Sequence, residues 1–321
     1  MSASIRISTF PEDGKDADTL LKNADIAMYR AKDQGRNNYQ FYSAQMNKHT
    51  FERLAMESSL RRAVERSEFL LHYQPKLDLR TGAIAGVEAL IRWKHPDWGM
   101  VSPAQFIPLA EETGLIVQIG EWVLKTACEQ SRQWRDQGIP GVRVAVNLSA
   151  RQFAQKSLLQ DVARIIAESG LTPESLELEI TESMVMQNAE HARETLEKLK
   201  AMGVSLSIDD FGTGYSSLAY LKRFPIDCVK IDRSFIKDIP TDADDMAITK
   251  GVIALGHSLR LKVVAEGVET VEQRDFLQTN DCDELQGFFF SKPLPAEEVT
   301  ALLKNHSRKP NLTVVEPRKR A

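Results

Sequence analysis

Eight apolar, often β-branched runs follow one another along most of this chain, and amphipathic segments separate most of them. The runs lie near residues 69–78, 84–93, 142–149, 176–181, 204–210, 228–233, 262–266 and 284–290. Strands that alternate with helices predict βα units and a parallel sheet. Eight strands in this order predict a (β/α)8 barrel, which takes about 250 residues. The 321 residues therefore hold one barrel and a smaller segment.

The turn between the first two runs is too short for two parallel strands. A short stretch containing Arg80, Thr81 and Gly82 joins these runs, whereas a parallel crossover needs a dozen or more residues. We therefore expect an antiparallel hairpin. The predicted fold class is α/β, a TIM-type barrel variant with one antiparallel strand.

The segments that flank the barrel are short. Residues 1–43 contain a strand, a turn, an amphipathic helix and a second strand, too little to bury a core of their own. We interpret them as the remnant of a larger α/β domain. We expect residues 44–68 to form a helical linker and residues 69–305 to form the barrel. Residues 306–321 are polar and contain proline, so we expect a disordered tail.

Composition excludes several classes of function. The 41 basic and 45 acidic residues give a net charge of −4, which provides no basic surface for duplex nucleic acid. The three cysteines are widely spaced and predict reduced thiols. No apolar run approaches the roughly 18 residues of a membrane span, and the start lacks the apolar core of a signal peptide. We expect a cytoplasmic chain without membrane contact, although segments upstream could anchor a longer protein.

Polar side chains lie at or near the ends of most of the strand-like runs. Because the carboxyl ends of parallel barrel strands meet at one mouth, where TIM barrels carry out their chemistry, we expect these side chains to converge. In chain order the residues are Glu88, Asn147, Glu179, Asp209, Asp210, Lys230, Glu266 and Gln286. A single strand-end glutamate is more often solvated or a cap, but polar positions in register on seven of eight runs favour a site.

Five of these residues are carboxylates, and only one is a cation. Carboxylates that close raise one another's pKa and oppose folding unless a cation neutralises them. Oxygen ligands favour Mg²⁺ or Mn²⁺. The adjacent Asp209 and Asp210 could serve two ions about 3.5–4 Å apart, an arrangement that cleaves phosphate esters. The glycines of the following DDFGTGYSS loop permit a bent backbone near a ligand, or an ordinary βα turn.

Seven segments resemble, in order, the signatures of the EAL family, whose typical members are cyclic di-GMP phosphodiesterases. The segments are GVEALIRW, VAVNLS, LELEITES, SIDDFGTGYSSL, VKIDRSFI, AEGVET and QGFFFSKPL, between about Phe69 and Leu303. The resemblance implies metal-dependent hydrolysis of cyclic di-GMP to linear pGpG with two Mg²⁺ or Mn²⁺ ions. It also implies a homodimer through the barrel and the DDFGTGYSS region.

The resemblance assigns a role to each matching position, and none departs from the family pattern. The residues at the two metal ions would be Glu88, Asn147, Glu179, Asp209, Asp210 and Glu269. The catalytic residues, which place or activate the attacking water, would be Glu266, Lys230 and Gln286. Gln74 and Arg92 would bind the substrate, and Glu182 would stabilise the DDFGTGYSS loop.

Residues 1–43 resemble the C-terminal end of a GGDEF, or diguanylate cyclase, domain, through FPEDGKD and NADIAMYRAKDQGRN. The GGDEF signature itself is absent from the sequence, so we expect no cyclase activity from this chain. Two alternatives to the phosphodiesterase stay open. One is a catalytically silent cyclic di-GMP receptor, and the other is a two-metal hydrolase of another dinucleotide.

Overall fold

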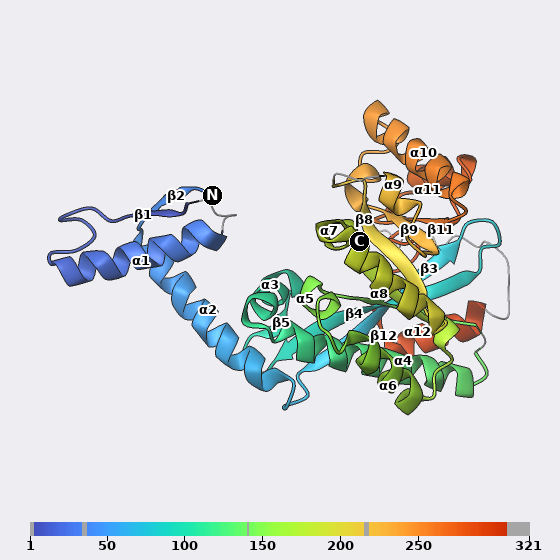
Figure 1. Ribbon diagram of the computed structural model, residues 1–321, viewed down its shortest axis with the longest axis horizontal. Helices are drawn as coiled ribbons and strands as arrows, with labels where there is room; N and C mark the ends of the chain where they lie inside the picture. The colour runs from blue at the N-terminus through green and yellow to red at the C-terminus, as the bar shows by residue number, and fades with distance from the viewer. Residues whose placement is uncertain (1–2, 34–36, 140, 215–217, 307–321) are drawn as a thin grey trace, which may run out of the picture. The chain divides into compact units, whose positions relative to one another are not determined.

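The computed structural model describes residues 3–33, 37–139, 141–214 and 218–306 (Figure 1). The chain divides into two compact units, Met1–Arg66 and Ser67–Ala321. The tail expected to be disordered lies almost wholly outside the described residues, as do residues 215–217 of the DDFGTGYSS loop. No helix of the described ranges is long and apolar enough to cross a membrane.

The first unit has the strand–helix–strand order that the sequence predicts. Its elements are β1 (Ile5–Ile7), α1 (Ala17–Asp33), β2 (Tyr39–Phe41) and α2 (Ala44–Ala63). Strands β1 and β2 pair in parallel, and α1 buries a stripe of alanines, Ala24, Ala27 and Ala31. Ile5, Tyr39 and Phe41 stay exposed, because a two-stranded sheet covers little apolar surface.

The second unit is a closed barrel of eight strands. The strands are β3 (Phe69–Asp78), β4 (Ile84–His95), β6 (Arg143–Asn147), β7 (Leu176–Thr181), β8 (Ser205–Phe211), β9 (Cys228–Ile231), β10 (Lys262–Ala265) and β11 (Glu284–Leu285). Strand β3 is antiparallel to both of its barrel neighbours, β4 and β11, whereas the remaining barrel pairs are parallel. The predicted hairpin and the barrel variant with one reversed strand are therefore confirmed.

Two details differ from the predicted runs. The last run, 284–290, forms a strand only over Glu284–Leu285, because Gly287 begins a turn in which Phe290 N–H donates to Gly287 O. Two short strands were not expected: β5 (Gly99–Val101) extends the sheet beside β4, and β12 (Leu294–Pro295) pairs with β3.

Helices surround the barrel strands (Figure 1). They are α3 (Pro103–Thr113), α4 (Ile116–Asp136), α5 (Ala150–Phe153), α6 (Leu158–Ser169), α7 (Glu182–Gln187), α8 (Ala189–Ala201), α9 (Leu218–Leu221), α10 (Ala243–Ser258), α11 (Val271–Thr279) and α12 (Ala296–His306), with 3₁₀ turns η1 (Pro173–Ser175) and η2 (Arg233–Phe235). In α6 an apolar stripe consists of Leu158, Val162, Ile165 and Ile166, all buried at helical spacing.

Strand alternation decides which side chains enter the barrel. In β7, Leu176, Leu178 and Ile180 are fully buried on one face, and Glu177 and Glu179 share the other. Both glutamates accept hydrogen bonds from a lysine on β3, so their face is the barrel interior. The outward face of β7 thus packs against the helices, and its inward face carries charge.

Candidate active site

A fully buried lysine lies at the centre of the carboxylate cluster. Lys230 on β9 has no exposed surface, and its Nζ lies 2.7 Å from Glu179 Oε2 and 3.2 Å from Asp209 Oδ2. The same Nζ lies 2.5 Å from Glu266 Oε1 and 3.9 Å from Glu88 Oε2. These carboxylates come from β4, β7, β8 and the end of β10, so the barrel brings together residues almost 180 positions apart.

Three amide side chains join this cluster through Glu88. Asn147 Nδ2 donates to Glu88 Oε1 at 2.6 Å, and Gln286 Nε2 donates to Glu88 Oε2 at 2.5 Å. Gln286 Nε2 also donates to Gln74 Oε1 at 3.0 Å, and Gln74 Nε2 donates to the backbone oxygen of Ser291. Within the described residues, Gln286 Oε1 is buried and has no hydrogen-bond partner. That amide oxygen is therefore available to a ligand.

The charges of the cluster are unevenly compensated. Burial, reinforced by the neighbouring carboxylates, raises the pKa of Glu266 to about 8 even though Lys230 opposes the shift. Burial also raises the pKa of Glu88. Burial would raise the pKa of Glu179 too, but Lys230 and Lys76 outweigh it and lower that pKa to about 2. Lys230 and Lys76 thus keep Glu179 ionised. Glu88 and Glu266 have too little positive charge nearby to offset the effect of burial on their pKa.

The strand β8 ends in a strained segment that leads into the glycine-rich loop. Asp210 has a φ of 55°, in the left-handed region that non-glycine residues seldom adopt. Burial and the adjacent Asp209 raise the pKa of Asp210. The next residue but one, Gly212, donates its backbone N–H to Glu182 Oε2 at 3.1 Å. Glu182 is 2% exposed, so this buried carboxylate ties the loop to α7.

Six of the twelve predicted site residues line one cavity of about 270 Å³. Its lining consists of Gln74, Glu88, Leu90, Asp209, Arg233, Glu266, Gly267, Glu269, Gln286, Gly287 and Phe288. Arg92 instead lines a neighbouring cavity of about 260 Å³ that Asn147 also borders. Its Nη1 donates to the carbonyl oxygen of Ile91, and the charge of Glu88 partly offsets the lowering of the Arg92 pKa by burial.

The sequence motifs did not indicate three residues that lie beside the site. Arg233 and Phe288 line the cavity, and Arg233 lies 3.8 Å from Glu269. Lys76 contacts Glu179 from the opposite side to Lys230. Alternation along β3 could have revealed Lys76, because it follows Gln74 by two positions and therefore shares its face.

Gly287, next to Gln286, packs closely against the backbone of Val268. A Cβ on residue 287 would lie 2.0 Å from the oxygen and 2.4 Å from the nitrogen of Val268. We expect Gly287→Ala to lower the free energy of unfolding by about 1–3 kcal/mol, as overpacking does. Thermal unfolding measures this loss. The control is Gly251→Ala in α10, where nothing lies within 4 Å and alanine favours the helix. Equal unfolding temperatures for the two variants would contradict close packing at Gly287.

The carboxylates surround the ammonium group of Lys230, and they are not arranged as the ligands of a metal centre are. Across residues 3–33, 37–139, 141–214 and 218–306, no three His, Cys, Asp or Glu side chains are arranged to hold a metal ion. The donors are nevertheless carboxylate and amide oxygens, which suit hard divalent cations. The buried free oxygen of Gln286 and the incompletely neutralised glutamates fit such an ion as well.

Comparison with known proteins identifies the family. The model of the EAL domain matches residues 57–293, and the model described as "Diguanylate cyclase, GGDEF domain" matches residues 1–38. This chain belongs to the EAL family, with a short GGDEF-family segment at its start.

The relatives are longer proteins. The bifunctional diguanylate cyclase/cyclic di-GMP phosphodiesterase MucR of Pseudomonas aeruginosa is 52% identical over 301 residues, which cover 94% of this chain and 44% of MucR. The cyclic di-GMP phosphodiesterase NbdA of the same species is 47% identical over 304 residues, which cover 95% of this chain and 39% of NbdA. This chain therefore spans about two fifths of the length of these curated relatives.

A solved structure agrees with the barrel. The PaMucR phosphodiesterase in complex with c-di-GMP superposes with a TM-score of 0.75 at 53% sequence identity. The match covers 76% of this chain and 99% of that one.

Proposed function

We propose that this chain is a divalent-cation-dependent phosphodiesterase that hydrolyses cyclic di-GMP to linear pGpG. The observation that carries the proposal is the convergence of Glu88, Glu179, Asp209 and Glu266 on Lys230 inside an EAL-family barrel. The similarity to MucR supports the substrate, because MucR is named as a cyclic di-GMP phosphodiesterase and the PaMucR phosphodiesterase has been solved in complex with c-di-GMP.

The residues proposed to hold two Mg²⁺ or Mn²⁺ ions all offer oxygen atoms. They are Glu88, Asn147, Glu179, Asp209, Asp210 and Glu269. Such ions, when bound, polarise a phosphate and lower the pKa of water toward neutrality. They would also supply the positive charge that Lys230 alone does not provide to the buried glutamates.

The other residues of the site have proposed roles in placing the reactants. Glu266 is the candidate to take a proton from the attacking water, since its raised pKa matches a general base near neutral pH. Lys230 orients Glu266 from 2.5 Å away, and Gln286 has a buried Oε1 that lacks a hydrogen-bond partner among the described residues. Attack of that water on a phosphorus breaks one P–O ester bond of the ring, the released sugar oxygen takes up a proton, and the product is the linear dinucleotide.

The proposed substrate contacts lie on β3 and β4. Gln74 borders the main cavity, and Arg92 borders the neighbouring one, from which its guanidinium would bind a phosphate. The glycine-rich loop that follows β8 is held by Glu182 through Gly212. The proposed metal-binding and catalytic roles therefore belong to the carboxylate cluster. The proposed roles in substrate binding and loop stabilisation belong to Gln74, Arg92 and Glu182 around it.

Removal of metal is the direct test. We expect the purified chain to convert cyclic di-GMP to pGpG with Mg²⁺ or Mn²⁺ and to lose this activity in EDTA, with recovery when excess metal is returned. Chromatographic separation of substrate and product measures the conversion. Tight binding of cyclic di-GMP without turnover in any metal would favour the receptor instead. Faster hydrolysis of another cyclic dinucleotide or of pGpG would identify a different substrate.

Domain organisation and assembly belong to the same proposal. We propose that residues 1–43 are a GGDEF remnant, 44–68 a linker, 69–305 the phosphodiesterase barrel and 306–321 a tail. A homodimer through the barrel and the DDFGTGYSS region remains a prediction. Sedimentation across a dilution series, with hydrolysis measured at each concentration, tests whether activity follows a dimer.

A further inference from the structure

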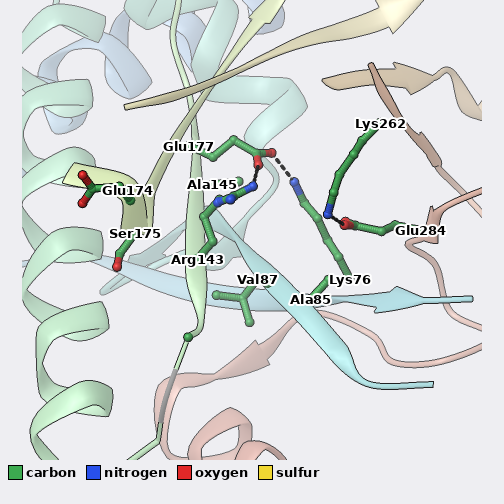
Figure 2. A pocket seen from close by; sticks show the side chains of 12 residues that line it. Lys76, Ala85, Val87, Arg143, Ala145, Glu174, Ser175, Glu177, Lys262 and Glu284 are labelled. Carbon is green, nitrogen blue, oxygen red and sulfur yellow. Dashed lines mark hydrogen bonds and ion pairs between the residues drawn. The ribbon is translucent and has the colours of Figure 1, made fainter. Parts of the chain in front are cut away.

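A second buried lysine lies below the proposed active site, and neither the family signatures nor the proposed roles include it. Lys76 on β3 has a side chain only 4% exposed. Its Nζ lies 2.7 Å from Glu177 Oε1 and 2.7 Å from Glu179 Oε1. Figure 2 shows Lys76 extending toward Glu177, which also faces Arg143. Lys76 therefore joins two glutamates of β7 from the opposite wall of the barrel.

Glu179 is held between two lysines, one at each of its oxygens. Lys76 donates to Oε1 and Lys230 donates to Oε2, each at 2.7 Å. The Glu179 side chain has no exposed surface, so water does not compete for either contact. Rotation of the carboxylate would break at least one charge-assisted hydrogen bond in a medium of low dielectric constant, where such bonds are strong.

Glu177, the other partner of Lys76, is held from the amino-terminal end of the barrel by Arg143. Arg143, Lys262 and Glu284, which begin or lie at the start of parallel strands, line a cavity of about 270 Å³ together with Lys76 and Glu177 (Figure 2). Arg143 Nη1 lies 3.4 Å from Glu177 Oε2, which leaves Glu177 Oε1 for Lys76. A continuous series of ion pairs thus runs from this cavity to the carboxylate cluster.

We propose that Lys76 is a positioning residue that acts through Glu179. It fixes Oε1 of Glu179 so that Oε2 is presented to the proposed cation site at the carboxyl mouth. Lys76 touches neither substrate nor cation in this arrangement, and its effect passes through the carboxylate. This inference rests on the proposed function for its catalytic consequence, whereas its effect on cation binding is measured without substrate.

The affinity of the full chain for Mn²⁺, measured by titration calorimetry, tests the inference. We expect Lys76→Met to weaken Mn²⁺ binding by about 10–100-fold, as loss of a partner behind a metal ligand does. Hydrolysis should lose a similar factor in kcat at saturating substrate, while KM for cyclic di-GMP changes less, because no substrate contact is removed. The matched control is Lys262→Met, which removes a lysine from the same cavity whose partner is Glu284 at 2.9 Å. Its Mn²⁺ affinity should equal that of the wild type.

The double variant Lys76→Met/Glu177→Gln separates positioning from charge balance. It removes one charge of each sign from the interior, and Glu179 keeps Lys230, so the fold should survive. We expect its Mn²⁺ affinity to remain as low as that of Lys76→Met. If either Lys76→Met or the double variant is folded and binds Mn²⁺ as tightly as the wild type, the inference is overturned.

The two proposals fail in different ways. Wild-type protein that binds Mn²⁺ but leaves cyclic di-GMP intact refutes the phosphodiesterase, and the calorimetric comparison still decides the role of Lys76. If the wild type is active, and Lys76→Met has the same activity and the same Mn²⁺ affinity, only the positioning role is refuted. Wild-type protein that neither binds Mn²⁺ nor hydrolyses cyclic di-GMP overturns both.

Discussion

Replacement of Glu88 by glutamine should reduce the turnover of cyclic di-GMP about a thousandfold, which corresponds to about 4 kcal/mol of transition-state stabilisation. Both oxygens of Glu88 are engaged, one by Asn147 Nδ2 at 2.6 Å and the other by Gln286 Nε2 at 2.5 Å. Glutamine keeps the size of the side chain but replaces one acceptor with an N–H₂ donor, which would face a donor amide. The variant also removes one negative charge from the proposed cation site. Initial rates of pGpG formation in saturating Mn²⁺ measure the effect.

The control for this experiment is a buried strand glutamate outside the carboxylate cluster. Glu284 on β11 is 7% exposed and pairs with Lys262 at the other end of the barrel. We expect Glu284→Gln to retain turnover within a few-fold of the wild type. Folding of both variants is checked by their thermal unfolding. Wild-type turnover in a folded Glu88→Gln protein would exclude Glu88 from the catalytic machinery.

Replacement of Lys230 by methionine should produce the largest loss of stability. Its Nζ lies within 3.2 Å of Glu179, Asp209 and Glu266, and the variant would leave these carboxylates without their shared cation. Removal of one partner from a buried ion pair typically costs about 3–5 kcal/mol. We expect this loss in EDTA. The loss should be smaller in Mn²⁺, because a bound cation would neutralise the carboxylates that lose Lys230 and so stabilise the folded variant. Denaturant unfolding in the two solutions measures the difference, and hydrolysis should be abolished in both.

A surface lysine provides the comparison for the Lys230 variant. Lys200 pairs with Asp227 at 2.6 Å, but both side chains are more than one third exposed. Solvent-exposed pairs contribute about 0–1 kcal/mol, so Lys200→Met should alter stability little in either solution. If Lys230→Met lost no more stability than Lys200→Met, the cluster would not depend on its lysine. If Mn²⁺ gave no recovery, the carboxylates would not form a cation site.

The spacing of apolar runs predicted the architecture correctly, because barrel strands and their helices obey local rules. The turn at residues 80–82 is too short for a crossover, and this one observation was sufficient to predict that β3 and β4 form an antiparallel hairpin. Polar residues at successive strand ends identified most of the cluster, since parallel strands bring their carboxyl ends to one mouth. Glu88, Asp209, Glu266 and Gln286 indeed border one cavity.

Other features depend on contacts between distant parts of the chain. The length of the last strand was overestimated, because the turn at Gly287 and its contact with Val268 leave no periodic signal. The position of Arg92 on a neighbouring cavity, with its guanidinium bonded to the Ile91 carbonyl oxygen, follows from its side-chain conformation, which a motif does not specify.

The sequence by itself determined the family, the order of the strands and the identity of most carboxylates, because alternation and strand ends are local properties of the chain. Only the tertiary structure revealed that Glu179 lies between Lys76 and Lys230. Those two contacts join residues 103 and 51 positions apart, and burial makes them strong by excluding water. Which charges neutralise one another is decided by closure of the barrel, since that closure brings opposite walls to within hydrogen-bonding distance.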